Sequence, residues 1–142
     1  ATAKYVVLNE DNGTILQTAG NVNFTSNIAL GSGQFTSYRD KVLGLGTTNG
    51  SITLDTLQAP AYTITLNGTL TLSTGTFTNA NAGASVTLII TQDGSGSRTL
   101  STSGIKWAGG SNTLSTAAGA IDIANFYYDG TNWYGSLVKG YA

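Results

Sequence analysis

The side chains best suited to chemistry in this chain are its seven acidic residues, because the sequence contains no histidine and no cysteine. A pair of carboxylates can hydrolyse a glycosidic bond without either of those residue types. However, Glu10 and Asp11 border an Asn-Gly turn, and Asp40 stands between Arg39 and Lys41. Such positions are typical of solvated turn residues and local ion pairs. We therefore predict that the protein is not an enzyme, and we assign no catalytic residue.

The composition also argues against a metal site or a cofactor. Without cysteine and histidine the chain lacks thiolate ligands and the commonest metal ligand. Asp93 and Asp129 lie in the Gly-containing loops QDGSGS and YDGTNW, whose oxygen atoms suit Ca²⁺. Neither loop repeats Asp at the spacing of a calcium-binding loop, and an Asp-Gly turn needs no ion to explain it. We expect no bound metal and no cofactor.

Aromatic side chains near Asn and Asp are a third chemical possibility. Lectin-like modules hold sugars in this way, and Trp107, Trp133 and Tyr134 are the candidates here. Aromatic residues in strands belong more often to a core or a subunit interface. A carbohydrate-binding role therefore stays open beside a structural one.

The elements that must position these residues are short strands. Hydrophobic and polar residues alternate in runs bounded by Gly, Asn, Asp and Ser, which is the pattern of β-structure. The spacing of about ten residues and the Gly-rich turns favour an all-β, antiparallel, jelly-roll-like sandwich. The predicted strands cover residues 4–9, 14–18, 21–24, 41–45, 51–57, 62–66, 69–73, 85–92, 98–102, 121–128 and 133–138.

The alternation does not reverse at Asn67-Gly68. Apolar residues occupy even positions before this pair, at Leu66, and after it, at Leu70. A two-residue hairpin would move the apolar face to the other side of the sheet. We expect either one long kinked strand or a three-residue loop with a bulge.

The C-terminal strands allow a prediction of register. If residues 129–132 form a four-residue loop, the residue numbers of every facing pair add up to the same total. The resulting register places aromatic residues opposite each other, an aromatic residue over a glycine, and opposite charges together. Both faces are then substantially apolar, which implies cover on both sides. The pairs are Tyr128 with Trp133, Phe126 with Gly135, Ala124 with Leu137 and Asp122 with Lys139 on one face, and Tyr127 with Tyr134, Asn125 with Ser136 and Ile123 with Val138 on the other.

The surface must be unusually poor in charge. Charged residues make up 9% of the 142 residues, against about a quarter in an ordinary soluble protein. Such a surface suits a subunit whose faces are covered by neighbours, and we predict a homotrimer. The net charge of -1 offers no basic patch for phosphates or anionic lipid, so we expect neither nucleic acid nor membrane as a partner.

The chain divides by pattern into an N-terminal β-hairpin or arm over residues 1–40 and a jelly-roll-like β-sandwich over residues 41–142, because alternation is less regular in the first part. The hairpin is predicted from the turn at Asn12-Gly13. Candidate attachment or interface residues lie in both parts. They are Val6, Val7, Leu8, Ile15, Leu16, Trp107, Tyr127, Trp133 and Tyr134.

From about Val42 onward, three stretches resemble a β-domain common in structural proteins of tailed phages: GSITLDTLQAPAYTITLNGTLTL, SVTLIITQDGSGSRTLSTSGIKWAGG and AIDIANFYYDGTNWYGSLV. The resemblance implies a jelly-roll-like fold, frequent trimerisation, a place on the virion surface and no enzymatic residues. The family usually has Pro near the Lys-Trp segment, where this chain has Ser103 and Gly104. The matching positions are Asp55, Gln92, Asp93, Arg98, Thr99, Lys106, Trp107, Asp122, Phe126, Trp133 and Tyr134.

Within that resemblance, our main expectation is a capsid decoration, or cement, protein that stabilises the shell. The chain starts at Ala1 as if only an initiator Met had been removed, so we expect it to be complete, with no adaptor domain. The N-terminal arm would then bind the major capsid protein or another virion protein by adding strands to a sheet edge. The alternatives are a tail-fibre or receptor-binding tip protein and a carbohydrate-binding module.

Overall fold

The structure, a computed structural model, describes residues 39–141. The chain divides into two units, residues 1–36 and 37–142, and the described residues all belong to the second. The predicted arm, with Val6, Val7, Leu8, Ile15 and Leu16, lies outside the described residues apart from its last two positions.

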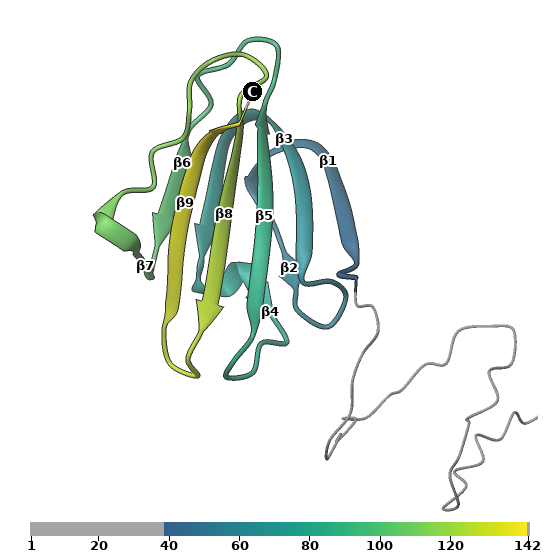
Figure 1. Ribbon diagram of the computed structural model, residues 1–142, viewed down its shortest axis with the longest axis vertical. Coiled ribbons are helices and arrows are strands. Elements are labelled where there is room, and N and C mark those ends of the chain that lie inside the picture. The colour runs from purple at the N-terminus through teal and green to yellow at the C-terminus, as the bar shows by residue number, and fades with distance from the viewer. Residues whose placement is uncertain (1–38, 142) are drawn as a thin grey trace, which may run out of the picture. The chain divides into compact units, whose positions relative to one another are not determined.

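The first half of the domain consists of three successive coils of chain. The first contains β1 (Val42–Ser51) and β2 (Leu54–Asp55), and the second contains β3 (Ala61–Ser73), the short 3-10 helix η1 (Thr74–Thr76) and β4 (Phe77–Thr78). The third contains β5 (Ser85–Gln92) and β6 (Leu100–Ser103). Each coil rises in one layer and returns in the other, so equivalent strands of neighbouring coils pair in parallel (Figure 1).

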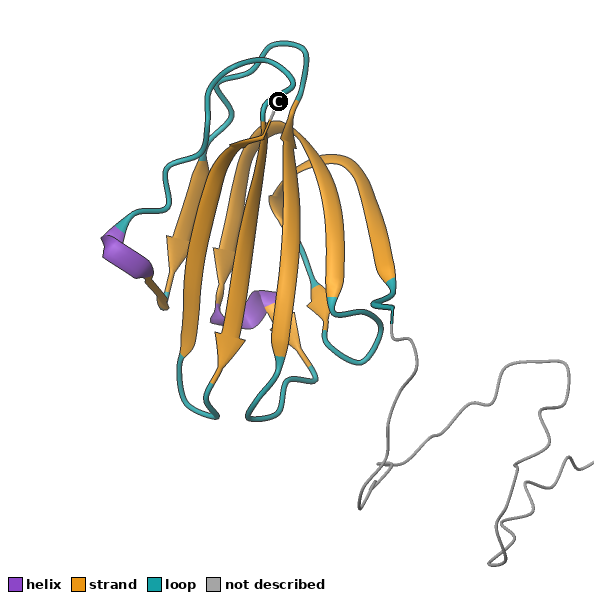
Figure 2. Cartoon of the chain, viewed as in Figure 1, coloured by secondary structure: helices purple, strands orange, loops and turns teal. Residues whose placement is uncertain are grey.

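The second half completes the layer that contains β5. The hairpin of β8 (Ile121–Tyr128) and β9 (Trp133–Tyr141) pairs antiparallel with β5, and β7 (Ile105–Trp107) pairs parallel with β9. The 3-10 helix η2 (Ala108–Gly110) follows β7. The sheet order is β1-β3-β5-β8-β9-β7, and β6 pairs with the second half of β3. The outer face of β5, β8 and β9 is turned toward the viewer in Figure 2.

The all-β prediction is confirmed, and the mixed sheet is compatible with a jelly-roll-like sandwich. The expectation of antiparallel pairing is right for β5, β8 and β9 but wrong for the other strands. The physical reason is that each coil crosses to the second layer and back before the next strand begins, which restores the strand direction. Alternation along one strand reports which residues face inward and carries no information about the direction of the neighbouring strand.

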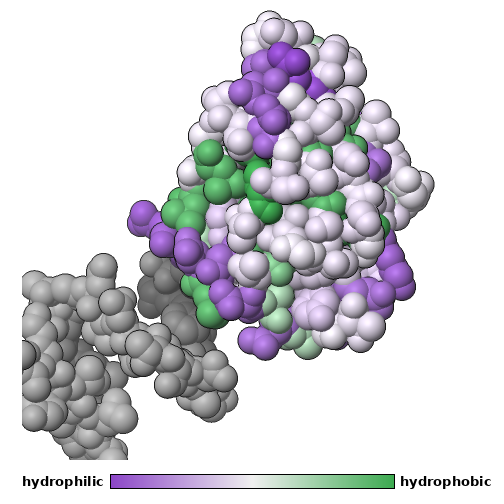
Figure 3. Space-filling view, turned by 180° about the vertical axis from the view of Figure 1, so that it is seen from behind, coloured by the Kyte–Doolittle hydropathy of each residue, from purple (hydrophilic) through white to green (hydrophobic). Residues whose placement is uncertain are grey.

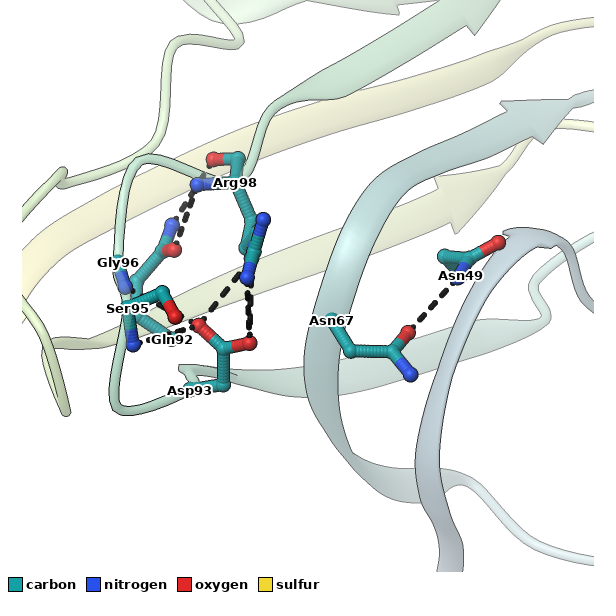
Figure 4. A network of polar contacts seen from close by, with 7 residues as sticks. All are labelled: Asn49, Asn67, Gln92, Asp93, Ser95, Gly96 and Arg98. Carbon is teal, nitrogen blue, oxygen red and sulfur yellow. Dashed lines mark hydrogen bonds and ion pairs between the residues drawn. The ribbon is translucent and has the colours of Figure 1, made fainter.

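The segment around Asn67-Gly68 is one long bent strand, as one of the two alternatives predicted. The first half of β3 pairs with β5 up to Leu66, and the second half pairs with β6 from Leu70. At the bend, Asn49 Nδ2 of β1 donates to Asn67 Oδ1 at 2.8 Å (Figure 4). A Cβ on Gly68 would lie 3.0 Å from the Cβ of Asn49, so the two coils approach closely at a position where glycine adds no side chain.

The core lies between the two layers and is filled mainly by Leu, Ile and aromatic residues. β3 contributes its even-numbered side chains, and the hairpin adds Phe126 and Trp133. Phe77 stacks on Trp133 with ring centroids 3.9 Å apart, and Tyr128 stacks on the same indole at 4.9 Å. The largest fully buried side chains are Tyr62, Leu54, Leu66, Leu70, Leu72, Leu88, Ile90, Val86 and Asp122.

The predicted register of the C-terminal hairpin is confirmed from Tyr128 with Trp133 to Ile123 with Val138, including Phe126 with Gly135. The predicted pairing of Asp122 with Lys139 is wrong. A register shift between Ile121 and Ile123 places Ile121 opposite Tyr141. Asp122 turns inward because buried donors bind it there, whereas Lys139 stays exposed.

Two buried polar side chains hold the loops at the end of the domain opposite the β8–β9 turn. Asp122 accepts from the Ser115 backbone N–H at 2.6 Å, from Ser115 Oγ at 2.7 Å and from the Gly140 N–H at 2.9 Å. Gln92 Nε2 donates to the Arg98 carbonyl, and its Oε1 accepts from the Arg98 N–H at 2.8 Å (Figure 4). The same Nε2 also donates to the Ser115 carbonyl. Both residues therefore fix the segment around Ser115 onto the sheet.

We predict that Asp122→Ala lowers the free energy of unfolding by about 3 kcal/mol, because it leaves the N–H groups of Ser115 and Gly140 without their acceptor. Urea denaturation followed by tryptophan fluorescence measures this change. Asp40→Ala removes an exposed carboxylate of equal charge and is the control, with an expected change below about 0.5 kcal/mol. Equal effects of the two substitutions would contradict the assigned role of Asp122.

We further predict that Gly96→Ala destabilises the protein by about 2 kcal/mol. Gly96 has φ +66°, and a Cβ there would collide with the Thr116 carbonyl and lie 2.9 Å from the Ala118 nitrogen. Gly94→Ala is the matched control, because nothing lies within 4 Å of its added Cβ. Thermal unfolding of the two variants side by side checks the prediction, which fails if Gly96→Ala unfolds at the temperature of Gly94→Ala.

Candidate functional site

The outer face of β5, β8, β9 and β7 contains an open groove of about 530 Å³. The strand register explains why it forms. One row across the strands, here called the tyrosine row, consists of Ser85, Tyr127, Tyr134 and Lys106. The neighbouring row, called the polar row, consists of the smaller residues Thr87, Asn125 and Ser136. Because a row of short side chains lies beside a row of long ones, the surface is hollowed along the polar row.

The tyrosine row forms one wall of this groove. Tyr127 and Tyr134 face each other across β8 and β9, and 50% and 42% of their surfaces are exposed. Lys106, on β7, places its Nζ 5.7 Å from the centroid of the Tyr134 ring, within the range of a cation–π contact. The wall thus combines two accessible aromatic rings with one positive charge.

Asp129, at the start of the β8–β9 turn, orients the Tyr134 hydroxyl, which donates to its Oδ2 at 3.0 Å. The backbone N–H groups of Asn132 and Thr131 donate to Oδ1 of the same carboxylate. These bonds, with that of Asn132 first, hold the pKa of Asp129 at about 2. In turn, the hydrogen bond to Asp129 raises the pKa of Tyr134 above its usual value. Asp129 is therefore ionised at neutral pH and is engaged in its own turn.

The polar row forms the floor of the groove. Thr87 Oγ1 and Asn125 Oδ1 are joined by a hydrogen bond of 3.0 Å across β5 and β8. Within residues 39–141, the Nδ2 of Asn125 has no hydrogen-bond partner, and Asn125 lines the groove with Ser136 beside it. The floor thus offers both donors and acceptors to a bound molecule.

The structure separates the predicted aromatic candidates. Tyr127 and Tyr134 lie together in the groove wall, and Trp107 borders the groove while its ring covers Gly135. Trp133 is only 3% exposed and stacks on Phe77. As a sugar-binding or interface candidate it was therefore wrongly predicted, because its position in the alternation places it on the inner face of the hairpin.

The uncharged polar groove residues that the predictions did not propose as site residues are Ser85, Thr87, Asn125 and Ser136. The predicted pairing of Asn125 with Ser136 on one face of the hairpin is the signal that could have indicated these two residues. Their connection to Lys106 depends on the parallel pairing of β7 with β9, which the sequence pattern did not indicate.

Within the part of the chain that the structure describes, the carboxylates do not gather into a reaction centre. Asp93 forms an ion pair with Arg98 at 2.8 Å, and the hydrogen bond from that guanidinium is the main reason that the pKa of Asp93 is lowered. Asp55 accepts from the Leu57 N–H and from Asn79 Nδ2. Among residues 39–141 no group of three or more potential metal ligands occurs. In the same range, no helix has the length and apolar character needed to span a bilayer.

Comparison with known proteins identifies a family for this domain. A family model described as "Putative phage tail fibre C-terminal domain" matches residues 47–133, from within β1 to the first residue of β9. The chain matches no curated protein and no solved structure. The family match covers more than half of the chain. The protein is therefore a structural component of a phage particle, located on the particle's surface, and the chain belongs to the family of phage tail fibre C-terminal domains.

Proposed function

We propose that this domain is the cell-contacting part of a tail fibre. The observation that carries the proposal is the family match, which spans most of the folded β-domain. A domain with this role must present a stable surface on which a host molecule can bind. The groove beside the tyrosine row is such a surface, because rigid strands hold its side chains.

This proposal replaces our main expectation of a capsid decoration protein. The cement hypothesis rested on the small size and the charge-poor surface of the chain. The arm that would bind the major capsid protein lies outside the described residues apart from its last two positions. The family match favours the alternative that we named, a tail-fibre or receptor-binding tip. Binding to a capsid shell therefore becomes the second possibility.

The proposed role is binding without catalysis. Each of Asp55, Asp93, Asp122 and Asp129 already accepts hydrogen bonds that hold a loop or a strand end in place. Using one of them as a general acid or a nucleophile would break those bonds. These contacts support a domain whose carboxylates serve stability, as the absence of histidine also suggested.

We also propose that the domain assembles as a homotrimer. Apolar side chains lie exposed in the first coil, where Val42 is 54% and Leu57 is 77% exposed. Seen from behind, the surface is dominated by weakly polar residues, and hydrophobic side chains gather toward the side that carries β1 (Figure 3). Burial of these side chains between copies would remove apolar surface from water, which favours association.

The location proposal predicts that antibodies against the domain label the ends of tail fibres. Electron microscopy of intact particles with gold-labelled antibodies provides the measurement. Particles that lack the gene are the control and should be unlabelled. Gold distributed over the capsid shell would contradict the fibre proposal and support the cement hypothesis.

The assembly proposal predicts a trimer mass for the full chain in light scattering at micromolar concentration. Val42→Asp combined with Leu57→Asp should shift the mass toward that of the monomer. Two carboxylates from each of the three copies would otherwise have to be buried in the interface. Val138→Asp is the matched control, since Val138 is 49% exposed on β9, away from the first coil. A monomeric wild-type protein would refute the trimer.

A further inference from the structure

We propose that the groove between the tyrosine row and the polar row binds an acidic saccharide. The proposal deepens the cell-contacting role above, because it names the class of host molecule that the domain contacts. It also stands on the geometry of the groove itself, so that binding can be tested apart from the biological role.

The shape of the groove suits a short, extended ligand. It crosses β5, β8, β9 and β7, and four strands at a spacing of about 4.8 Å span about 14 Å between the outer two. One side is bounded by the two tyrosine rings, and the floor stays low at Thr87, Asn125 and Ser136. A chain of a few sugar rings lying across the strands fits such a channel.

The chemistry of the two rows matches the two sides of a sugar ring. The C–H face of a pyranose packs on an aromatic ring, and Tyr127 and Tyr134 offer adjacent, half-exposed rings. Sugar hydroxyls both donate and accept hydrogen bonds. The amide nitrogen of Asn125 and the hydroxyl of Ser136 lie in the floor, where they can meet those hydroxyls.

The charge of the groove selects an acidic sugar. Among the described residues that line it, Lys106 is the one that carries a charge. Asp129, at the start of the β8–β9 turn, accepts hydrogen bonds from Thr131, Asn132 and Tyr134 and is not among the residues that line the groove. A carboxylate on the ligand would find an ammonium partner at Lys106, and a charge-assisted hydrogen bond of this kind is among the stronger polar contacts.

The same features argue against a peptide as the occupant. An extended peptide binds most readily along a free strand edge, where backbone groups pair in order. The groove instead crosses the strands, whose backbone groups are already used in the sheet. Only side chains are available to the ligand, and hydroxyl-rich molecules are well suited to them.

The test is calorimetric titration of the full chain with oligomers of galacturonic acid and with galactose oligomers of equal length. We expect saturable binding of the acidic oligomer and weaker binding of the neutral one. Lys106→Gln should weaken acidic-oligomer binding about tenfold and leave the neutral oligomer nearly unaffected. Tyr127→Ala should weaken both, because both sugars use the ring face.

Matched controls lie outside the groove on the same hairpin. Lys139→Gln removes an equal charge and Tyr141→Ala an equal aromatic ring, and neither should change binding. The proposal is overturned if the acidic oligomer does not bind, if it binds no more tightly than the neutral one, or if the control variants lose as much affinity as the groove variants.

A competition assay separates this inference from the proposed function. Purified wild-type protein should block adsorption of the phage to its host, and Lys106→Gln should block it less well. If all variants block adsorption equally, the domain contacts the cell through another surface and the groove is not the host-binding site. If the oligomer binds in the groove but wild-type protein never blocks adsorption, the cell-contacting function is wrong and the saccharide site stands.

Discussion

The domain depends on one constraint in β3, which must serve both layers without changing the face that it buries. Tyr62, Ile64 and Leu66 point into the core from the first layer, and Leu70 and Leu72 point into it from the second. The bend at Asn67 and Gly68 preserves this alternation while the strand changes partner from β5 to β6. Because β3 also pairs with β1, all three coils are positioned by this single strand.

The sequence predicted most strongly what depends on neighbouring residues. The bounds of β5 and β8, the register of the C-terminal hairpin and the bend of β3 follow from alternation and turn chemistry, which act over a few residues. The parallel pairing of the coils was not predictable in this way, since it depends on how the chain crosses between layers. The partner of Asp122 was wrongly predicted for a similar reason. Its partner Ser115 comes from the segment before β8 and its partner Gly140 lies near the end of β9, whereas Lys139 was chosen from strand register alone.

The candidate site was predictable only in part. Tyr127 and Tyr134 could be placed side by side from the hairpin register alone. Lys106 joins them only because β7 pairs with β9, and Thr87 only because β5 pairs with β8. Four of the eleven positions that matched the phage β-domain are buried and secure the fold: Gln92, Asp122, Phe126 and Trp133. The groove lies on the opposite face of the same strands, so its residues can change with little effect on the core.

The irregular edge of β1 affects whether copies of the protein aggregate when they are held close together. Within the described residues β1 is the last strand of its sheet, and it carries register shifts on both sides of Thr47 and Thr48. Gly46 and Gly50, with φ of +71° and +73°, turn the backbone out of the regular pleat. A straight edge on a stack of parallel coils would be a template for the next molecule, and repeated addition would give an amyloid-like filament. The two glycines interrupt that template and so guard the protein against aggregation at high local concentration.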